Sequence, residues 1–274
     1  RRIRTTRMEY QDIHFEVAGG IATLTLNRPE NRNVITDAAT IAEIESICRR
    51  INDNLDIRVL IITGADPAFS AGGNVKQMAD RSGMFAGSPA ELMESYRKNV
   101  QRIPLAVHGL EAPTIAAVNG PAIGAGCDLA LMCDMRVASE RARFGETFLN
   151  VGIIPGDGGA YFLPRAVGMA RACELTFTGE IIDAAAALDM GLVNYVTEHD
   201  QLLPRARELA AKIAAQPPRA LRMAKRLLYM GQYMSLPHLL EQSAACQALC
   251  HHTDDHQEAL RALFEKRQPD FTGN

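Results

Sequence analysis

The residues best suited to chemistry lie in a glycine-rich stretch near the middle of the chain. Residues 113–118 are an apolar run that ends at an Asn-Gly pair, which is typical of a buried strand and a turn. The segment GPAIGAG follows and leads into residues 127–132, which are apolar enough for a buried helix. Free backbone N–H groups at a helix start suit an oxygen that becomes negative during a reaction. Asp128, in the first turn of this helix, adds a carboxylate.

Other readings of this stretch are open when it is taken alone. Glycine-rich strand-to-helix turns also bind phosphates, but the stretch contains neither GxGxxG nor Gly-Lys-Ser/Thr. A tight turn with a purely structural role is the remaining alternative.

Five segments carry a resemblance to one family, in the family's order along the chain. The two most specific are residues 116–139 (AAVNGPAIGAGCDLALMCDMRVAS) and residues 68–78 (AFSAGGNVKQM); residues 26–36, 144–165 and 258–271 also match. Together they resemble the crotonase superfamily, the enoyl-CoA hydratases and isomerases, from about residue 10 to the end of the chain. The resemblance implies an α/β fold of the ClpP/crotonase type, a spiral of β-β-α turns with an α-helical C-terminal trimerisation region.

The resemblance also implies an oxyanion hole, a pair of hydrogen-bond donors for a thioester oxygen that becomes enolate-like. Matched to the family's motifs, the donors are the backbone N–H groups of Gly73 and Ala125. Small residues at both positions let a substrate approach the main chain closely. Losing one such donor typically costs ~2.7–4 kcal/mol of transition-state stabilisation.

The acid and base that move protons are less clearly marked. The hydratases use two glutamates, of which the first matches Asp128 and the second matches Phe148, which cannot carry a proton. Asp157 is the best substitute, although it could equally be the N-cap of the helix that follows it. Glu146 is a weaker candidate, because we expect it to point elsewhere on an extended segment. Dienoyl-CoA isomerases also carry an aspartate at the first position, and their later aspartate stands one residue from Asp157 in an ungapped match.

A site for the CoA carrier follows from the resemblance as well. Arg28 and Arg32 fall where the family meets CoA phosphates, and Lys266 matches a tail lysine that reaches a neighbouring subunit's ligand. The adenine slot is expected along the backbone of Ser70, Ala71, Gly72, Asn74 and Val75, together with Gly73. CoA enters as part of the substrate, so no separate cofactor is expected. No metal is expected either, because His252 and His256 lack a third ligand.

The composition argues against several classes of function. The 274 residues carry a formal net charge of −3 and no Trp, which argues against a nucleic-acid partner. No apolar run approaches the ~20 residues of a membrane span, and the basic residues 1–7 are not followed by the apolar segment of a secretory signal. Six scattered cysteines without a C-x-x-C pair indicate reduced thiols in a cytoplasmic protein.

Hydrophobic periodicity predicts the elements that position these residues. A β-hairpin is expected over residues 10–27, then a helix over 37–54 capped by Asp37 and a buried strand over 58–63. A helix with a bend at Pro164 is expected over residues 160–177. Helices alone follow, over residues 201–216, 219–230, 236–252 and 255–266.

We therefore expect a spiral core with the CoA-thioester site in residues 1–200 and a helical oligomerisation region in residues 201–274. The favoured activity is hydration of a 2-enoyl-CoA by a homotrimer or dimer of trimers, with Asp128 and Asp157 as acid/base residues. Isomerisation of an enoyl- or dienoyl-CoA double bond is the alternative. A CoA-binding or assembly subunit with impaired catalysis is the second alternative, suggested by Phe148.

Overall fold

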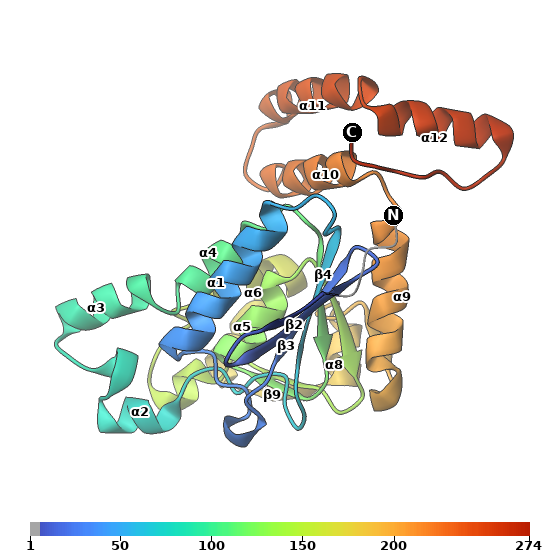
Figure 1. Ribbon diagram of the computed structural model, residues 1–274. Coiled ribbons are helices and arrows are strands. Elements are labelled where there is room, and N and C mark those ends of the chain that lie inside the picture. Colours follow the sequence, from blue (N-terminus) through green and yellow to red (C-terminus); the bar gives the residue numbers. More distant parts are fainter. Residues whose placement is uncertain (1–5) are drawn as a thin grey trace.

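The computed structural model describes residues 6–274, so residues 1–5 of the basic N-terminal segment lie outside the described residues. Two sheets form within this range (Figure 1). The larger has the strand order β1-β2-β3-β4-β5-β7-β10; β1 to β3 pair antiparallel and the pairs from β3 to β10 are parallel. Its strands are Thr6–Glu9 (β1), Ile13–Ala18 (β2), Ile21–Leu26 (β3), Val59–Gly64 (β4), Thr114–Val118 (β5), Met135–Ser139 (β7) and Tyr195–Thr197 (β10).

The smaller sheet has the order β6-β8-β9, and helices cover both sheets. Its strands are Pro121–Ile123 (β6), Arg143–Gly145 (β8) and Ile181–Asp183 (β9). The helices of the core are Ala38–Asn52 (α1), Val75–Asp80 (α2), Pro89–Lys98 (α3), Arg102–His108 (α4), Ala125–Met132 (α5), Gly159–Val167 (α6), Met169–Thr178 (α7), Ala184–Asp189 (α8) and Leu202–Ala214 (α9). Three more helices follow at the C-terminal end: Pro218–Met230 (α10), Leu236–His251 (α11) and Asp254–Glu265 (α12).

Strand β4 shows why the centre of the large sheet is uniformly apolar. Every residue of Val59–Gly64 is buried, because helices pack on both faces of the sheet. Leu60 and Ile62 point into the core that contains the buried isoleucines of α1. Val59 and Ile61 point the other way, into a second core that α9 closes with Ala206 and Ala210. The small alanines let α9 lie close to the sheet.

The fold confirms the expected crotonase-type architecture and most of its elements. The hairpin is β2 and β3, and the four late helices are α9 to α12, with ends within a few residues of those expected. Because α9 packs against the sheet, the packing favours a boundary after Ala214 over one near residue 200. Figure 1 shows α10, α11 and α12 stacked together beyond the end of the sheet.

Two local expectations are wrong. The side chain of Asp37 does not cap α1, because it forms an ion pair with Arg28 instead. The single helix expected over residues 160–177 is two helices, and Pro164 lies inside the first of them, α6. The chain turns at Gly168 instead, whose φ of 80° separates α6 from α7 and favours a residue without a Cβ.

Between residues 6 and 274, no helix is both long enough and apolar enough to span a membrane.

Candidate active site

The loop of residues 70–74 is held against the start of α5 by hydrogen bonds through Ser70. The Ser70 carbonyl accepts from the Ile123 amide at 3.0 Å, and the Ser70 amide donates to the Pro121 carbonyl at 3.1 Å. Its hydroxyl donates to the Asn33 carbonyl at 2.7 Å. Ser70 is completely buried, and each of its polar groups has a partner in the protein. It therefore fixes the loop and leaves no polar group free for a ligand.

Gly72 brings the backbone of this loop next to the backbone of α5. Its φ is +76°, and a Cβ at this position would lie 2.4 Å from the Ile123 oxygen and 2.8 Å from the Ala125 nitrogen. Neither neighbour can move aside as a flexible side chain would. Glycine is thus required both for the backbone conformation and for the close approach of the two segments.

Gly73 and Ala125, the two expected oxyanion donors, line the same cavity. Ala125 is the first residue of α5, where an amide has no carbonyl within the helix to bond. Within residues 6–274, no backbone acceptor takes a hydrogen bond from either amide. Both N–H groups are consequently available to an oxygen that enters the cavity.

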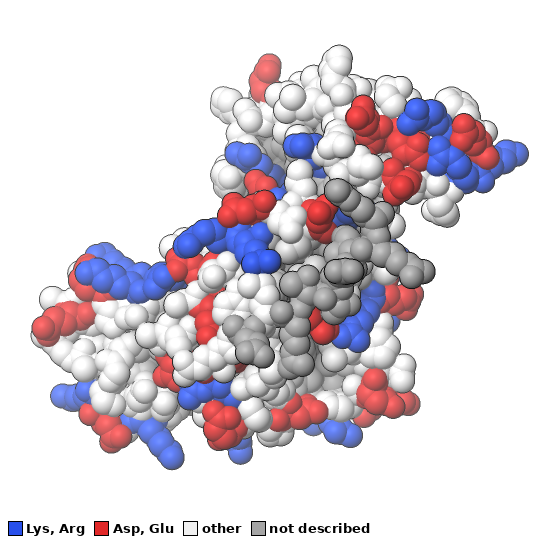
Figure 2. Space-filling model, viewed as in Figure 1, with Lys and Arg blue, Asp and Glu red and all other residues white. Residues whose placement is uncertain are grey.

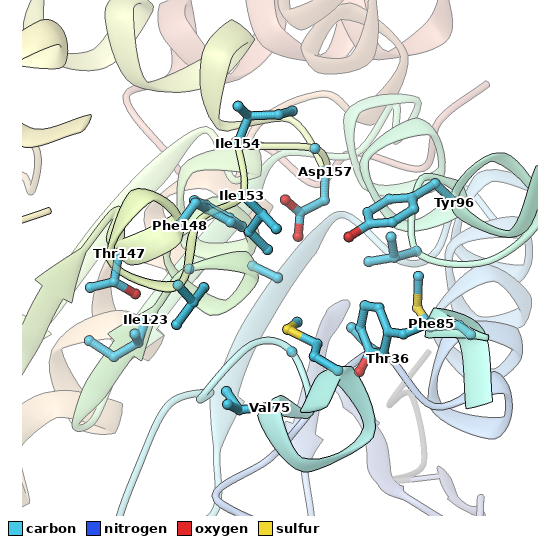
Figure 3. Close-up of a pocket in the computed structure, with 18 of the residues that line it drawn as sticks. Thr36, Val75, Phe85, Tyr96, Ile123, Thr147, Phe148, Ile153, Ile154 and Asp157 are labelled. Atoms are coloured by element: carbon cyan, nitrogen blue, oxygen red, sulfur yellow. The ribbon is translucent and has the colours of Figure 1, made fainter. Parts of the chain in front are cut away.

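Most of the other residues that line the cavity are apolar (Figure 3). Its lining includes apolar side chains from residues 78–100 and from residues 148–154, namely Met78, Met84, Phe85, Val100, Phe148, Val151, Ile153 and Ile154. Met84 and Phe85 come from a 3-10 turn in the segment before α3, which has no marked pattern in the sequence. A short apolar group would be excluded from water here.

Asp157 is the acidic residue that meets this cavity. Figure 3 shows its carboxyl group pointing into the cavity, toward the hydroxyl of Tyr96 on α3. The side chain is only 5% exposed, and its Oδ1 has no hydrogen-bond partner among the described residues. Helix α6 begins at Gly159 with Gly158 as N-cap and no side-chain cap, so the N-cap alternative for Asp157 is wrong.

Asp128 and Glu146 lie behind Asp157, outside the cavity lining. Both are buried, and a Cβ on Gly159 would lie 2.4 Å from the Asp128 Oδ1 and 2.8 Å from the Glu146 Oε2. Glu146 points elsewhere than Phe148, as expected: Phe148 lines the cavity and Glu146 does not. The chain leaves β8 at Glu146, whose ψ of 64° leads into the next 3-10 helix. The structure thus gathers three carboxyl groups.

Burial is the main cause of the pKa shifts of these three carboxyl groups. It raises the pKa of Asp128 well above its ordinary value, and the charges of Glu146 and Asp157 raise it further. Burial also raises the pKa of Glu146 to about 7 and raises the pKa of Asp157. No ion pair with a lysine, arginine or histidine of residues 6–274 offsets these charges. A raised pKa near neutrality suits a group that must both take and give a proton.

Comparison with known proteins decides the family. The sequence profile described as enoyl-CoA hydratase/isomerase matches residues 16–274. The chain belongs to the enoyl-CoA hydratase/isomerase family. It is 35% identical to a crotonyl-CoA hydratase of Syntrophomonas wolfei, over 96% of this chain and 99% of that protein. It is 37% identical to a 2,3-dehydroadipyl-CoA hydratase of Escherichia coli, over 92% and 95%. A crystal structure of an enoyl-CoA hydratase from Bacillus anthracis superposes with a TM-score of 0.89 at 35% identity, covering 96% of this chain and 100% of that one.

The residues expected to bind CoA in an enoyl-CoA hydratase/isomerase lie in different settings. Arg32 is exposed, and its carbonyl accepts from the Ala71 amide at 2.8 Å, which places it beside the loop of residues 70–74. Arg28 instead pairs with Asp37, Asp12 and Glu30. These partners compete with a phosphate for its guanidinium group.

The other residues expected to contact CoA also lie in different settings. Val75 is 59% exposed at the cavity edge, whereas the Asn74 side chain caps α2 by accepting from the Gln77 amide. Lys266 follows α12, which Figure 1 shows at the opposite end of the molecule from α2. Its expected contact is with a neighbouring subunit's ligand, so that role stays a prediction.

Tyr96 and the 3-10 turn with Met84 and Phe85 are cavity residues that the sequence did not indicate. Burial and the charge of Asp157 raise the pKa of Tyr96, so its hydroxyl stays protonated and can donate a hydrogen bond. Across residues 6–274, no group of three or more His, Cys, Asp and Glu side chains is arranged to hold a metal ion.

Proposed function

We propose that this chain hydrates a 2-enoyl-CoA thioester, with Gly73 and Ala125 as the oxyanion hole and Asp157 as the proton-transferring residue. One observation carries the proposal: the carboxyl group of Asp157, whose Oδ1 has no hydrogen-bond partner among the described residues, faces the same cavity as the two free backbone amides. Their shared cavity would bring a thioester carbonyl and a base to one substrate. Membership of the enoyl-CoA hydratase/isomerase family supports it.

The proposed reaction is a balanced addition of water. The Asp157 carboxylate takes a proton from water while the water oxygen bonds to C3 of the enoyl group. The π electron pair of the C2–C3 bond forms a C1–C2 double bond, and the carbonyl π pair moves onto the thioester oxygen, which the amides of Gly73 and Ala125 stabilise. The enolate then collapses, C2 takes the proton from Asp157, and the carboxylate is restored. Asp128 supports Asp157 from behind as a hydrogen-bond donor.

Isomerisation of a double bond is the second candidate, and one observation favours it. Of the three clustered acids, Asp157 alone lines the cavity, and a single base is sufficient to move a proton between two carbons. The third candidate is a CoA-binding or assembly subunit, motivated by the Phe148 side chain at the cavity wall.

One labelling experiment separates the three. The protein is incubated with a short 2-enoyl-CoA and a dienoyl-CoA in water enriched in oxygen-18 and deuterium. The masses of the products are then measured by mass spectrometry. Incorporation of oxygen-18 supports hydration. Deuterium uptake or a shifted double bond without oxygen-18 supports isomerisation, and tight CoA-ester binding with neither supports the binding subunit.

The cavity also favours a neutral acyl group. Its lining within the described residues contains no lysine, arginine or histidine, and its acidic group is Asp157. A second carboxylate on the acyl chain would be repelled there and would lose its hydration without a partner. We expect kcat/KM for trans-2-hexenoyl-CoA to exceed that for the analogue of equal length ending in a carboxylate by at least about tenfold.

We further propose a cytoplasmic homo-oligomer, either a trimer or a dimer of trimers. The six cysteines are free thiols, as expected in a reducing compartment. The C-terminal helices expose several large apolar side chains, including Leu228, Leu240, Leu249, Leu263 and Phe264. Apolar surface of this kind is typical of a protein–protein interface, and other copies of the chain are its proposed partners.

A further inference from the structure

The water molecule of the proposed hydration needs a second contact besides Asp157. While the water gives one proton to Asp157, its oxygen becomes hydroxide-like, and a hydrogen-bond donor stabilises such an oxygen. Phe148 stands where the hydratases carry their second glutamate, and its ring offers the water no hydrogen bond. Asp128 and Glu146 do not line the cavity. The second contact therefore has to come from another side chain of the cavity wall.

Three side-chain hydroxyl groups line the cavity, those of Thr36, Tyr96 and Thr147. The Thr36 hydroxyl already accepts a hydrogen bond from a backbone amide. Figure 3 shows Thr147 on the far side of Phe148 from Asp157. The Tyr96 hydroxyl, in contrast, points toward the Asp157 carboxyl group in the same view. Of the three, Tyr96 is the one placed beside the proton-transferring residue.

Two contacts fix Tyr96 on α3 relative to the loop that carries Asp157. A Cβ on Gly156, the residue before Asp157, would lie 3.2 Å from the Tyr96 Cε1, so the ring edge packs on this backbone. The Gln101 amide donates to the Tyr96 carbonyl at 3.1 Å, and the Gln101 Nε2 donates to the Gly156 carbonyl at 2.8 Å. Gln101 thus ties the end of α3 to the Asp157 loop.

We propose that the Tyr96 hydroxyl is the second hydrogen-bonding group for the reacting water, in the role that a second carboxyl group would otherwise have. This inference rests on the proposed hydration. The water donates one hydrogen to the Asp157 carboxylate, while the Tyr96 O–H donates to the water oxygen. As the proton passes to Asp157, the oxygen bonds to C3 and Tyr96 stabilises its partial negative charge. Tyr96 keeps its own proton throughout, and in the reverse reaction it stabilises the departing oxygen.

The test compares Tyr96→Phe with Tyr233→Phe, the same change at a residue after α10 that is 70% exposed. Phenylalanine keeps the ring and its packing on Gly156, so the fold should be preserved. With crotonyl-CoA we expect kcat for hydration to fall by about 10²-fold in Tyr96→Phe, because one donor to a developing negative charge is lost. Tyr233→Phe should keep the wild-type kcat. A wild-type kcat in Tyr96→Phe would overturn the proposal.

A second reaction separates a contact to the water from a merely structural role. Exchange of deuterium from heavy water into C2 of butyryl-CoA needs Asp157 and the two backbone amides, but no water is added to the acyl group. Tyr96→Phe should exchange at the wild-type rate, whereas Asp157→Asn should lose exchange and hydration together. Equal losses of both reactions in Tyr96→Phe would mean that Tyr96 only holds Asp157 in place, and this would overturn the proposal.

The wild-type protein shows which of the two proposals has failed. If it exchanges deuterium into butyryl-CoA but adds no oxygen-18 to crotonyl-CoA, the proposed hydration is wrong, and Tyr96 has no reacting water to contact. If it hydrates crotonyl-CoA and Tyr96→Phe does so equally fast, the hydration stands and only the role of Tyr96 is wrong.

Discussion

Asp157 combines burial, an unsatisfied oxygen and access to the cavity, and this combination separates it from the surface acids of the chain. A surface aspartate has water to solvate it and an ordinary proton affinity. The Asp157 carboxyl group is largely withdrawn from water, and its neighbours Asp128 and Glu146 are acids, not cations. These conditions favour a group that exchanges protons with a substrate.

Replacing Asp157 by Asn tests its role. The amide keeps the shape of the side chain but cannot take a proton from water, so kcat should fall by about 10²–10⁴-fold while KM changes little. Steady-state kinetics with crotonyl-CoA measure both. Asp200→Asn, an exposed substitution in the 3-10 turn before α9, is the control. Wild-type turnover in Asp157→Asn would remove the residue from the mechanism.

The buried Glu146 predicts a pH-dependent stability. Its folded-state pKa of about 7 lies above the ordinary 4.5, so its contribution to stability is full below pH 4.5 and is lost as the pH rises through 7. Over that interval the free energy of unfolding should fall by on the order of 3 kcal/mol more in wild type than in Glu146→Gln. Urea unfolding at several pH values measures the difference. Parallel pH curves for the two proteins would contradict it.

At the scale of elements, helix and strand positions follow from the sequence wherever apolar periodicity is strong. The isoleucine face of α1 and the fully buried β4 are examples, since each pattern has one good packing solution. Single side-chain directions do not follow in the same way. Asp37 pairs with Arg28 and does not cap α1, and the Glu146 side chain lies beside that of Asp128 on α5, next to Gly159. Such choices depend on contacts between distant parts of the chain.

The start of α5 allows a change to one proposed oxyanion donor, the Ala125 amide. Proline is tolerated at the first position of a helix, where its missing N–H has no helical partner. Ala125→Pro removes this N–H and should lower kcat by about 10²–10³-fold. Gly72 approaches the same nitrogen closely, so circular dichroism checks that the variant folds like the wild type. Ala38→Pro makes the same change at the exposed first residue of α1 and should leave kcat unaltered. Equal kcat values for the two variants would argue against the Ala125 amide as a donor.

At the scale of the whole molecule, the C-terminal helices carry apolar side chains that one chain leaves uncovered. Figure 2 shows broad areas without charge on this part of the surface, next to the mixed charges around α12. Leu263 and Phe264 are 70% and 80% exposed near the end of α12. We expect an oligomer both from the family resemblance and from this exposed apolar surface.

Placing a charge on this surface should separate the subunits. Phe264→Asp would bury an unpaired carboxylate in any interface that covers α12, which costs several kcal/mol. Light scattering coupled to size-exclusion chromatography should find an oligomer for wild type and smaller species for the variant. Glu265→Gln, an exposed change at the adjacent residue, should leave the mass unchanged. A wild-type chain that elutes as a monomer would contradict the proposed assembly.

A bound acyl-CoA tests the proposal that the Gly73 and Ala125 amides converge on one thioester oxygen. The measurement is the infrared stretching frequency of a carbon-13-labelled thioester carbonyl on a slowly reacting enoyl-CoA. Two hydrogen bonds polarise the carbonyl, so we predict a lower frequency on wild type and Ala38→Pro than in water, and a smaller decrease on Ala125→Pro. A bound carbonyl that keeps its frequency in water on the wild-type protein would contradict the oxyanion hole.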